Sequence, residues 1–494
     1  MQYAFVIDQR KCIGCHACTV ACKAENEVPL GQFRTWVKYV EKGTFPTVRR
    51  HFTVLRCNHC DAAPCVEICP VEALHKRPDA IVDLDRDLCI GCRACMQACP
   101  YDALYLNDST GTAEKCHYCA HRTELGLEPA CVIVCPVHAI VAGDMANPES
   151  EIATLRREQP TSQRRLEKGT QPRVWYVDAL PEALVPGSAA EPIQYLWSDR
   201  LSPPPVYPGF EPPSDLLTAL DVPHPPVWGW HIWSYLMTKN VAAGVMIAAP
   251  LLSFAKVGGT AGGYVPEILG LLFLTITTVL LVHDLGRPER FLKIIFHPNT
   301  KSWLVKGAWV LMGFGLLTTL SLAARFFGRD QAADLLRWAN LPFAVLASGY
   351  TAFLLAQCKG RDLWLEKSLF AHLIVRAALL GAGVAVLLPG AAAHKGALLS
   401  YLGLVAANFL WLLLDKSGGP HSTDGKKAHA LLWAKKPTRK ALAALGVATL
   451  LAAAMPFAGG AAILLGAASF ALAIAGLFLF EKEWIKAGQE VPNS

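Results

Sequence analysis

The spacing of the cysteines is the chemical feature that says most about this sequence. Sixteen of the seventeen cysteines fall within the first 135 residues, in the quartets Cys12-Cys15-Cys18-Cys22, Cys57-Cys60-Cys65-Cys69, Cys89-Cys92-Cys95-Cys99 and Cys116-Cys119-Cys131-Cys135. Runs of this kind place three thiolates at three corners of one iron–sulfur cube, and the fourth cysteine binds a neighbouring cluster. The sixteen thiols therefore predict four [4Fe–4S] clusters in one small domain, an arrangement that conducts electrons.

Three other uses of these cysteines fit the spacing less well. A disulfide framework also needs an even number of cysteines, but repeated C-x-x-C runs are typical of metal sites. Structural zinc sites use similar spacing, although the run C-x2-C-x2-C-x3-C is typical of iron–sulfur sites. The segment from Cys12 to His16 matches the C-x-x-C-H pattern of covalent haem attachment, but such a haem would leave Cys18 and Cys22 without partners.

An internal repeat surrounds the quartets. Short β-type segments precede the first three quartets, at 5–8, 52–55 and 80–84, and similar segments follow the Cys-Pro pairs, at 71–74, 101–104 and 137–140. This repeat predicts a duplicated bacterial ferredoxin domain of α+β class over residues 1–180, with a helix at 149–158. About a dozen prolines between Leu180 and Pro226 indicate an extended, semi-rigid strap over residues 181–227.

The composition changes sharply after the strap, because residues 228–494 are rich in Ala, Leu and Gly and contain long uncharged runs. The net charge is only +6 and the basic residues of this half cluster in its loops, so no nucleic-acid partner is expected. The amino terminus lacks the pattern of a signal peptide, so we expect no export signal on this chain.

Eight apolar segments are close to the roughly 20 residues that a helix needs to cross a bilayer. They span approximately 231–254, 265–283, 303–325, 338–358, 369–389, 397–414, 440–457 and 461–481. We therefore expect an all-α transmembrane domain of about eight helices over residues 228–494. Lys and Arg number 17 in the loops on the iron–sulfur side and 5 on the other. The positive-inside rule then places the iron–sulfur domain on the cytoplasmic side of the inner membrane, unless an exported partner carries it across.

Polar residues of the apolar half concentrate on the iron–sulfur side. A charged side chain in hydrocarbon costs about 2.5–3.5 kcal/mol on insertion scales, so such residues usually have a function. A quinone headgroup needs hydrogen-bond donors at both carbonyls and a route for protons. The candidates for these tasks are His231, Tyr235, Lys239, His283, Asp284, His372 and Arg376.

Each of these residues also has a purely structural explanation. Lys239, for example, could snorkel to the interface or neutralise Asp284. Haem b is the main alternative cofactor and needs facing intramembrane histidines. The three plausible histidines all lie toward one side, so they could hold at most one haem, and none is expected. A sparse candidate chain for protons across the bilayer comprises Glu267, Thr275, Asn340 and Arg376.

Residues 1–180 resemble the four-cluster electron-transfer subunits of the molybdopterin oxidoreductase family, as in dimethyl sulfoxide, polysulfide and tetrathionate reductases. All four cysteine motifs match without a missing cysteine. In that family the first and fourth quartets share two clusters, and the second and third share the other two. The resemblance implies four ligand sets: Cys12, Cys15, Cys18 and Cys135; Cys22, Cys116, Cys119 and Cys131; Cys57, Cys60, Cys65 and Cys99; and Cys69, Cys89, Cys92 and Cys95.

Residues 228–494 resemble the NrfD-like family of polysulfide reductase membrane subunits. The motifs that carry this resemblance are Trp228-Gly229-Trp230, Ala242-Ala243-Gly244, the run from His283 to Phe291 and the run from Ser302 to Trp309. Members of that family have eight helices, lack haem, and oxidise or reduce a quinol near the iron–sulfur subunit. The two parts are usually separate polypeptides, so their fusion departs from the common pattern, as does Lys239 in the first helix.

These features together predict an electron-transfer and quinone-reactive membrane subunit of a respiratory oxidoreductase complex. Electrons pass between a molybdopterin-type catalytic subunit and a menaquinone or ubiquinone pool. Nothing here resembles a pterin-binding or substrate-reducing site, so catalysis on the substrate is expected on the partner chain. Two alternatives stay open: a subunit of a proton-translocating assembly similar to alternative complex III, and a passive membrane anchor that carries a ferredoxin domain.

Overall fold

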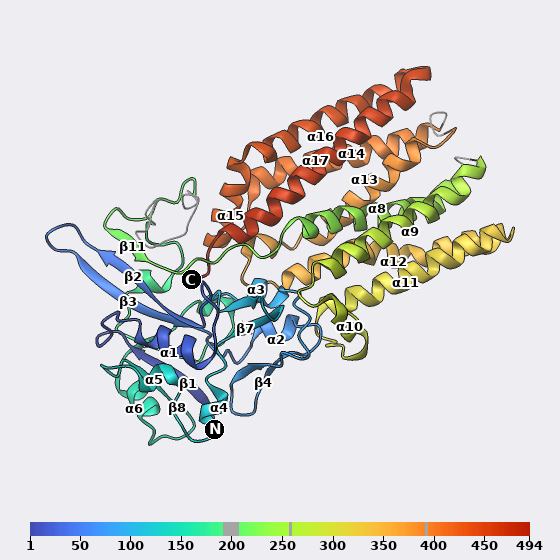
Figure 1. The fold of residues 1–494 in the computed structure, drawn as a ribbon. Coiled ribbons are helices and arrows are strands. Elements are labelled where there is room, and N and C mark those ends of the chain that lie inside the picture. The colour runs from blue at the N-terminus through green and yellow to red at the C-terminus, as the bar shows by residue number, and fades with distance from the viewer. Residues whose placement is uncertain (191–206, 256–258, 391–393) are drawn as a thin grey trace.

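The computed structural model describes residues 1–190, 207–255, 259–390 and 394–494, and for residues 259–262 it describes the backbone alone. The chain has two parts, a mixed α/β part and a bundle of long helices (Figure 1). We call the first part, which carries the sixteen clustered cysteines, the cysteine-rich domain. The part from Trp230 onward is called the membrane domain.

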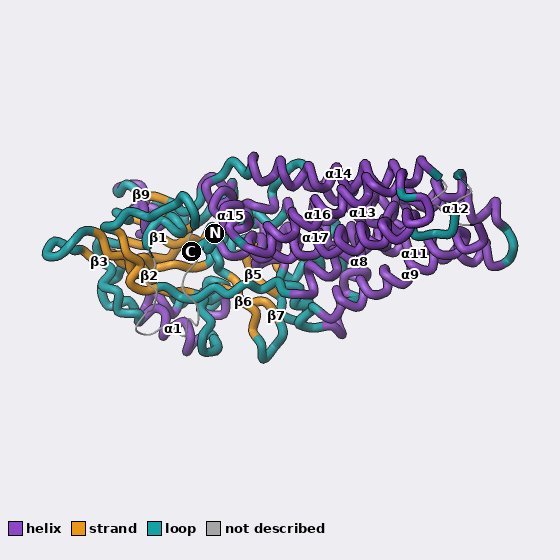
Figure 2. The backbone as a smooth tube through the Cα atoms, turned by 90° about the horizontal axis from the view of Figure 1, so that it is seen from above, coloured by secondary structure: helices purple, strands orange, loops and turns teal. Residues whose placement is uncertain are grey.

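The strands all belong to the cysteine-rich domain (Figure 2). They are β1 (Tyr3–Asp8), β2 (Thr35–Lys42), β3 (Arg49–Arg56), β4 (Leu74–Lys76), β5 (Val82–Leu84), β6 (Leu104–Asn107), β7 (Thr112–Lys115), β8 (Ile140–Asp144), β9 (Thr161–Ser162), β10 (Val174–Val177) and β11 (Leu216–Leu220). They form sheets with the orders β8-β1-β10-β9 and β11-β2-β3, and the hairpins β4-β5 and β6-β7. In the first sheet β1 is parallel to β10 and antiparallel to β8.

The predicted repeat of strand and cysteine loop is present. β1, β3 and β5 each lead into a quartet, and β4, β6 and β8 each begin shortly after a Cys-Pro pair. Short helices lie within or beside the cysteine quartets: α1 (Ala17–Glu25), α2 (Pro64–Ile68), α3 (Ala94–Ala98), α4 (Ala120–Thr123) and α5 (Ala130–Ile133). The helix predicted at 149–158 is α6 (Glu151–Glu158), which begins where the Ser150 hydroxyl accepts a hydrogen bond from the Ala153 amide. The predicted α+β ferredoxin-like class is confirmed.

The proline-rich strap contains regular structure as well. Helix α7 (Pro181–Leu184) opens it, and β11 pairs antiparallel with β2. This part of the strap therefore adds an edge strand to the cysteine-rich domain. Residues 191–206 of the strap lie outside the described residues.

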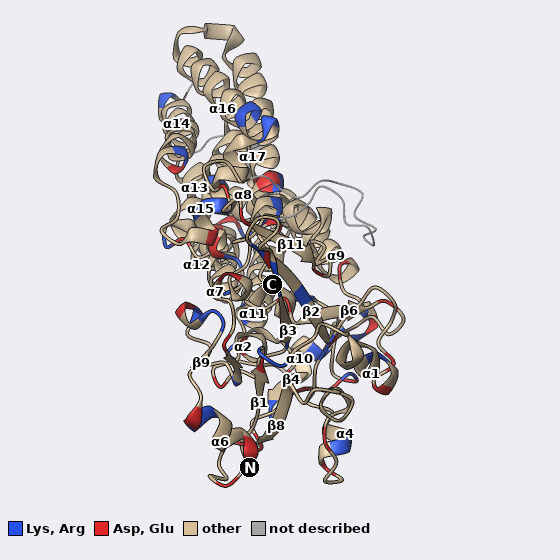
Figure 3. Ribbon diagram, turned by 90° about the vertical axis from the view of Figure 1, so that its left-hand side faces the viewer, with Lys and Arg blue, Asp and Glu red and all other residues tan. Residues whose placement is uncertain are grey.

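Eight helices of the described residues are long and apolar enough to cross a membrane, which confirms the predicted count. They correspond to α8 (Trp230–Phe254), α9 (Gly259–His283), α11 (Trp303–Phe326), α12 (Asp330–Ala356), α13 (Leu369–Val386), α14 (Lys395–Gly418), α16 (Lys436–Ala454) and α17 (Ala462–Glu490). Two shorter helices, α10 (Lys293–Phe296) and α15 (Thr423–Ala434), lie in loops between them. Most charged residues lie in the cysteine-rich domain and near helix ends (Figure 3).

Several of these helices are longer than expected, α12 and α17 among them. α12 begins at Asp330 rather than at 338, because its early charged residues have partners: Asp330 pairs with Arg325, and Arg337 is buried in an ion pair with Glu267. α17 continues to Glu490 rather than ending at 481, and its last turns contact the cysteine-rich domain, where Gln97 donates to Gln489 at 2.7 Å.

The membrane helices form two groups that meet at α8, the most buried span. One group contains α8, α9, α11 and α12, and the other contains α13, α14, α16 and α17. α8 and α13 approach closely at Gly244 and Gly381, where a Cβ atom on Gly244 would lie 1.9 Å from the Ala377 carbonyl oxygen. Only glycine permits this approach, as in other membrane helix pairs with small residues at the contact.

The loops on one end of the bundle bind the cysteine-rich domain. Asp424, Asp362 and Arg361 of these loops pair with Arg165, Lys168 and Asp102 respectively. The amide of Asn493, near the end of the chain, donates to Asp102 at 2.8 Å. These partners come from two different loops and the C-terminal tail, so separate segments at one end of the bundle share the contact.

Candidate functional site

Twelve of the sixteen clustered cysteines line three enclosed cavities, four thiols to each. The groups are Cys57, Cys60, Cys65 and Cys99; Cys69, Cys89, Cys92 and Cys95; and Cys22, Cys116, Cys119 and Cys131. These groups coincide with three of the ligand sets that the family resemblance implies. Among the described residues, no three Cys, His, Asp or Glu side chains could hold a single metal ion. The thiols of each group are instead spread around a cavity, an arrangement suited to a polynuclear cluster.

The fourth group lies nearer the surface. Cys12 is within electrostatic range of Cys15 and Cys135, and Cys18 is within range of Cys12. Cys15 is exposed, whereas Cys12 and Cys135 are half-buried and Cys18 is buried. This group therefore forms the exposed end of the cysteine array.

Neighbouring groups form a single series. Pairs of thiols from different groups lie within electrostatic range: Cys95 of Cys65, Cys57 of Cys116, and Cys18 of Cys131. The series thus runs from the group containing Cys92, through the two intermediate groups, to the group containing the exposed Cys15.

A buried arginine, Arg56, indicates that the cavity beside it suits a negatively charged cofactor. Arg56 is fully buried, and its NH1 donates to Cys131 Sγ at 3.3 Å. Its Nε and NH2 have no hydrogen-bond partner among the described residues. Burial also raises the pKa of Cys18 to about 11 despite the nearby Arg56. A buried cation needs a compensating charge and the thiols need a group that stabilises their thiolate form, so the site fits a thiolate-bound iron–sulfur cluster.

The loop between α9 and α11 holds the cysteines nearest the membrane domain. The Asn299 side-chain amide donates to the Cys69 carbonyl at 2.8 Å, and the Ser302 hydroxyl donates to the Ile68 carbonyl at 2.7 Å. The Gly286 amide donates to the Gly91 carbonyl at 3.1 Å. A Cβ atom on Gly286 would lie 2.3 Å from the Gly111 carbonyl oxygen, so only glycine allows this backbone contact.

A largely apolar cavity of about 470 Å³ lies in the membrane domain directly beneath this loop. Its volume lies in the usual range of small-molecule sites. Two of its lining residues, Met312 and Leu316, are 46% and 61% exposed on the outer face of the bundle, so the cavity reaches the surface that would face lipid. Its polar lining residues include Tyr235, Thr278, Asp284 and Tyr350, together with Cys92 and Trp228.

Asp284 connects this cavity to the outside. Its Oδ1 lies 3.2 Å from His231 Nδ1, and His231 Nε2 lies 2.9 Å from His283 Nδ1. The three groups run from buried Asp284, through half-buried His231, to exposed His283. Burial raises the pKa of Asp284 to about 6, against the opposing effect of Arg93 and His283. A carboxyl with such a pKa can exchange protons near neutral pH.

The three other predicted residues lie behind the cavity and do not line it. Lys239 Nζ donates to the Ser348 carbonyl at 2.9 Å, and it does not neutralise Asp284. Arg376 donates to His372 Nε2 at 2.9 Å and to Glu481 Oε1 at 3.2 Å.

Sequence reasoning missed four polar residues of this region: Arg93, Tyr350, Thr351 and Glu481. Of these four residues, Glu481 had the clearest signal in the sequence, because it is an acidic residue at the end of the last apolar segment.

Two of the alternatives raised by the sequence can be compared with this geometry. His231 and His283 are directly hydrogen-bonded, which leaves no space between them for a haem iron. The residues suggested as a transmembrane proton chain are not brought together. Glu267 pairs with Arg337, exposed Thr275 donates to its own helix at the Leu271 carbonyl, Asn340 donates to Thr318, and Arg376 lies in the other helix group.

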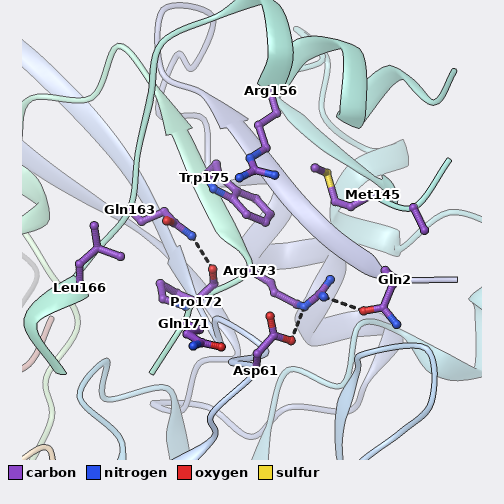
Figure 4. Close-up of a pocket in the computed structure, with 11 residues that line it drawn as sticks. Gln2, Asp61, Met145, Arg156, Gln163, Leu166, Gln171, Pro172, Arg173 and Trp175 are labelled. Atoms are coloured by element: carbon purple, nitrogen blue, oxygen red, sulfur yellow. Dashed lines mark hydrogen bonds and ion pairs between the residues drawn. The ribbon is translucent and has the colours of Figure 1, made fainter. Parts of the chain in front are cut away.

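A second hollow, of about 500 Å³, lies in the cysteine-rich domain (Figure 4). Its charged groups already have partners: Arg173 bonds to Asp61 and Gln2, and Arg156 stands over the ring of Trp175 at 4.5 Å. No cysteine lines this hollow, so it is separate from the redox groups.

Comparison with known families agrees with both halves of the chain. Residues 3–24 match a 4Fe-4S binding domain, residues 48–145 match a 4Fe-4S dicluster domain, and residues 220–414 match the family described as polysulphide reductase, NrfD. The family matches support [4Fe–4S] clusters in the first part and a multi-pass membrane domain in the second.

Among known proteins, the sequence is 44% identical to a tetrathionate reductase subunit of Salmonella typhimurium, over 80% of that protein and 40% of this chain. It is 42% identical to protein NrfC of Escherichia coli, over 81% of that protein and 36% of this chain. It is 38% identical to a polysulfide reductase polypeptide of Wolinella succinogenes, over 94% of that protein and 36% of this chain. The chain therefore belongs to the family of iron–sulfur electron-transfer subunits of reductase complexes, here fused to an NrfD-type membrane domain.

Proposed function

We propose that this chain transfers electrons between a quinone in the membrane-domain cavity and a catalytic subunit of molybdopterin type, which docks on the cysteine-rich domain. The observation that carries this proposal is that Cys92, a predicted cluster ligand, lines the same cavity as Tyr235 and Asp284. A quinone ring held there would lie beside the cysteine group of Cys92, and its isoprenoid tail could leave past Met312 and Leu316 toward lipid.

Different side chains have different roles in this proposal. The four predicted ligand sets would hold four [4Fe–4S] clusters, which supply one-electron transfer when bound. Tyr235 and Tyr350 line the cavity, and their hydroxyls would donate hydrogen bonds to a quinone carbonyl. Asp284 accepts a proton at the cavity, and His231 and His283 pass it to the surface. Menaquinone and ubiquinone share the ring chemistry that this arrangement requires.

The catalytic partner is expected at the other end of the cysteine series. There Cys15 is exposed, and Ile13, Val20 and Ile133 are 55%, 63% and 65% exposed. An apolar surface around a redox group is suited to binding another protein. Two of the relatives named above are parts of tetrathionate and polysulfide reductases, so a substrate-reducing chain is the expected partner.

The membrane topology is also part of the proposal. The loops that contact the cysteine-rich domain carry most of the basic residues of the membrane domain. The positive-inside rule therefore favours the inner membrane with the cysteine-rich domain on the cytoplasmic side. Protease accessibility in inverted and right-side-out vesicles tests this orientation.

Purification of the full-length chain with its associated partners tests the central claim. We expect a large co-purifying chain that contains molybdenum or tungsten, and about sixteen iron atoms per copy of this chain from four clusters. A quinol analogue should reduce the clusters, as seen by electron paramagnetic resonance. Clusters that dithionite reduces but quinol does not would contradict the quinone assignment, and a complex without a large metal-containing chain would contradict the partner assignment.

A further inference from the structure

A buried lysine lies next to the residues that line the proposed quinone cavity. Lys239 on α8 is 1% exposed, and its Nζ donates to the Ser348 carbonyl and to the Thr351 hydroxyl. The Thr351 side chain lies beside Tyr235 and Tyr350, which both line the cavity. Lys239 Nζ lies 4.5 Å from the centre of the Tyr350 ring, so the lysine adjoins the lining of the cavity.

A buried carboxylate lies beyond the lysine, in the other helix group. Glu481 on α17 is 1% exposed and within electrostatic range of Lys239. Its Oε1 accepts from Arg376 at 3.2 Å, whereas Oε2 has no hydrogen-bond partner in the described part of the chain. An unpartnered buried carboxylate oxygen is costly, and it is a ready acceptor for a proton.

The charges of Lys239, Arg376 and Glu481 allow these side chains to accept one additional proton. Arg376 stays protonated, so its charge balances that of ionised Glu481. The other groups near the pair are neutral: the phenols of Tyr235 and Tyr350, and His372, whose Nε2 accepts from Arg376. Two further acidic residues lie near Arg376: Asp415, which pairs with His429 at 3.5 Å, and the exposed Glu366. The group is therefore electrically balanced when Lys239 is a neutral amine, whose two N–H groups match its two acceptors.

We propose that Thr351, Lys239 and Glu481 form a proton relay between the quinone cavity and the contact of the two helix groups. The inference rests on the proposed quinone chemistry. Quinol oxidation releases two electrons and two protons, and the electrons leave toward the cysteine group of Cys92. One proton passes to Asp284. The other passes through the Tyr235 and Thr351 hydroxyls, which each give up one proton and gain one, to the Lys239 amine and then to the Glu481 carboxylate. Quinone reduction uses the same route in reverse.

Three substitutions, one at each residue of the relay, test it in the purified complex. Thr351→Val removes the bridging hydroxyl, Glu481→Gln removes the terminal acceptor, and Lys239→Met removes the amine. We expect each to slow quinol-driven cluster reduction by about 100-fold, the low end of what proton transfer contributes to catalysis. The solvent deuterium isotope effect on that step should rise. Lys482→Met is the matched control, because it makes the same change at the half-buried residue next to Glu481.

Iron content and reduction by dithionite report on folding and cluster assembly independently of quinol. The relay is supported if the three variants keep both and lose the quinol step, while the control matches the unaltered complex. It is overturned if all three retain the original rate and isotope effect, or if their losses match losses of iron. Failure of the unaltered complex to react with quinol would instead overturn the proposed function.

Discussion

Asp284 Oδ1 lies 3.5 Å from NH1 of Arg93, the residue that follows Cys92. This contact joins a carboxyl group of the membrane domain to a loop of predicted cluster ligands. The same carboxyl lies 3.2 Å from His231, which leads toward the surface. In the proposed mechanism, the proton acceptor Asp284 therefore contacts the residue that directly follows the predicted cluster ligand Cys92.

Replacement of Asp284 by Asn should slow quinol oxidation without affecting the clusters. The amide keeps the shape of the side chain but cannot accept the proton, so we expect a fall of about 100-fold in quinol-driven cluster reduction. Stopped-flow absorbance of the clusters measures this rate. Glu289→Gln is the control, because that carboxylate is 58% exposed and pairs with Arg287 in the same loop. An Asp284→Asn complex as fast as the control would refute a role for Asp284 in proton transfer.

Serine substitutions at the two ends of the cysteine series should have different effects. Cys92→Ser alters the group beside the cavity, so quinol should no longer deliver electrons to any cluster. Cys15→Ser alters the exposed end, so quinol should still reduce the other clusters while electron transfer to the catalytic partner is lost. Electron paramagnetic resonance after quinol addition distinguishes the two. If both variants lost quinol-driven reduction equally, the inferred order of the series would be wrong.

Arg56→Met should lower the reduction potential of the cluster held by Cys22, Cys116, Cys119 and Cys131. The guanidinium is fully buried beside these thiols, so its positive charge favours the more negative reduced state. We expect a shift of several tens of millivolts in a potentiometric titration followed by electron paramagnetic resonance. Arg50→Met is the control, since Arg50 is 51% exposed and pairs with Glu41. Equal shifts in both variants would contradict a local effect of Arg56.

Gly286→Ala should weaken the contact between the two domains. The added Cβ would meet the Gly111 carbonyl oxygen at 2.3 Å, and backbone atoms cannot move aside as a flexible side chain can. Overpacking of this kind costs about 1–3 kcal/mol, so the complex should unfold at a lower temperature and release the cysteine-rich domain more readily to protease. Gly396→Ala provides the comparison, because a Cβ there has open space. A Gly286→Ala complex as stable as this comparison would show that the contact can relax.

Much of this architecture could be predicted because it depends on local patterns. The cysteines of each quartet lie within 20 residues of each other, so spacing alone identifies a cluster motif. The eight helices could be counted because each must be apolar over its whole length to cross a bilayer. The extent of α12 and α17 could not be predicted from hydropathy, since their charged and polar residues have partners on other helices or on the cysteine-rich domain.

The sequence by itself determined which chemical groups are available, namely sixteen clustered thiols and a set of polar residues toward one end of an apolar bundle. Only the tertiary structure decided which of them meet. It placed Cys92, Tyr235 and Asp284 around one cavity. It also gave Lys239 the charged partner Glu481 and not Asp284. The physical reason is that helix packing, set by contacts such as Gly244 with Gly381, determines which faces meet across the bundle, and hydropathy along the chain carries no record of that choice.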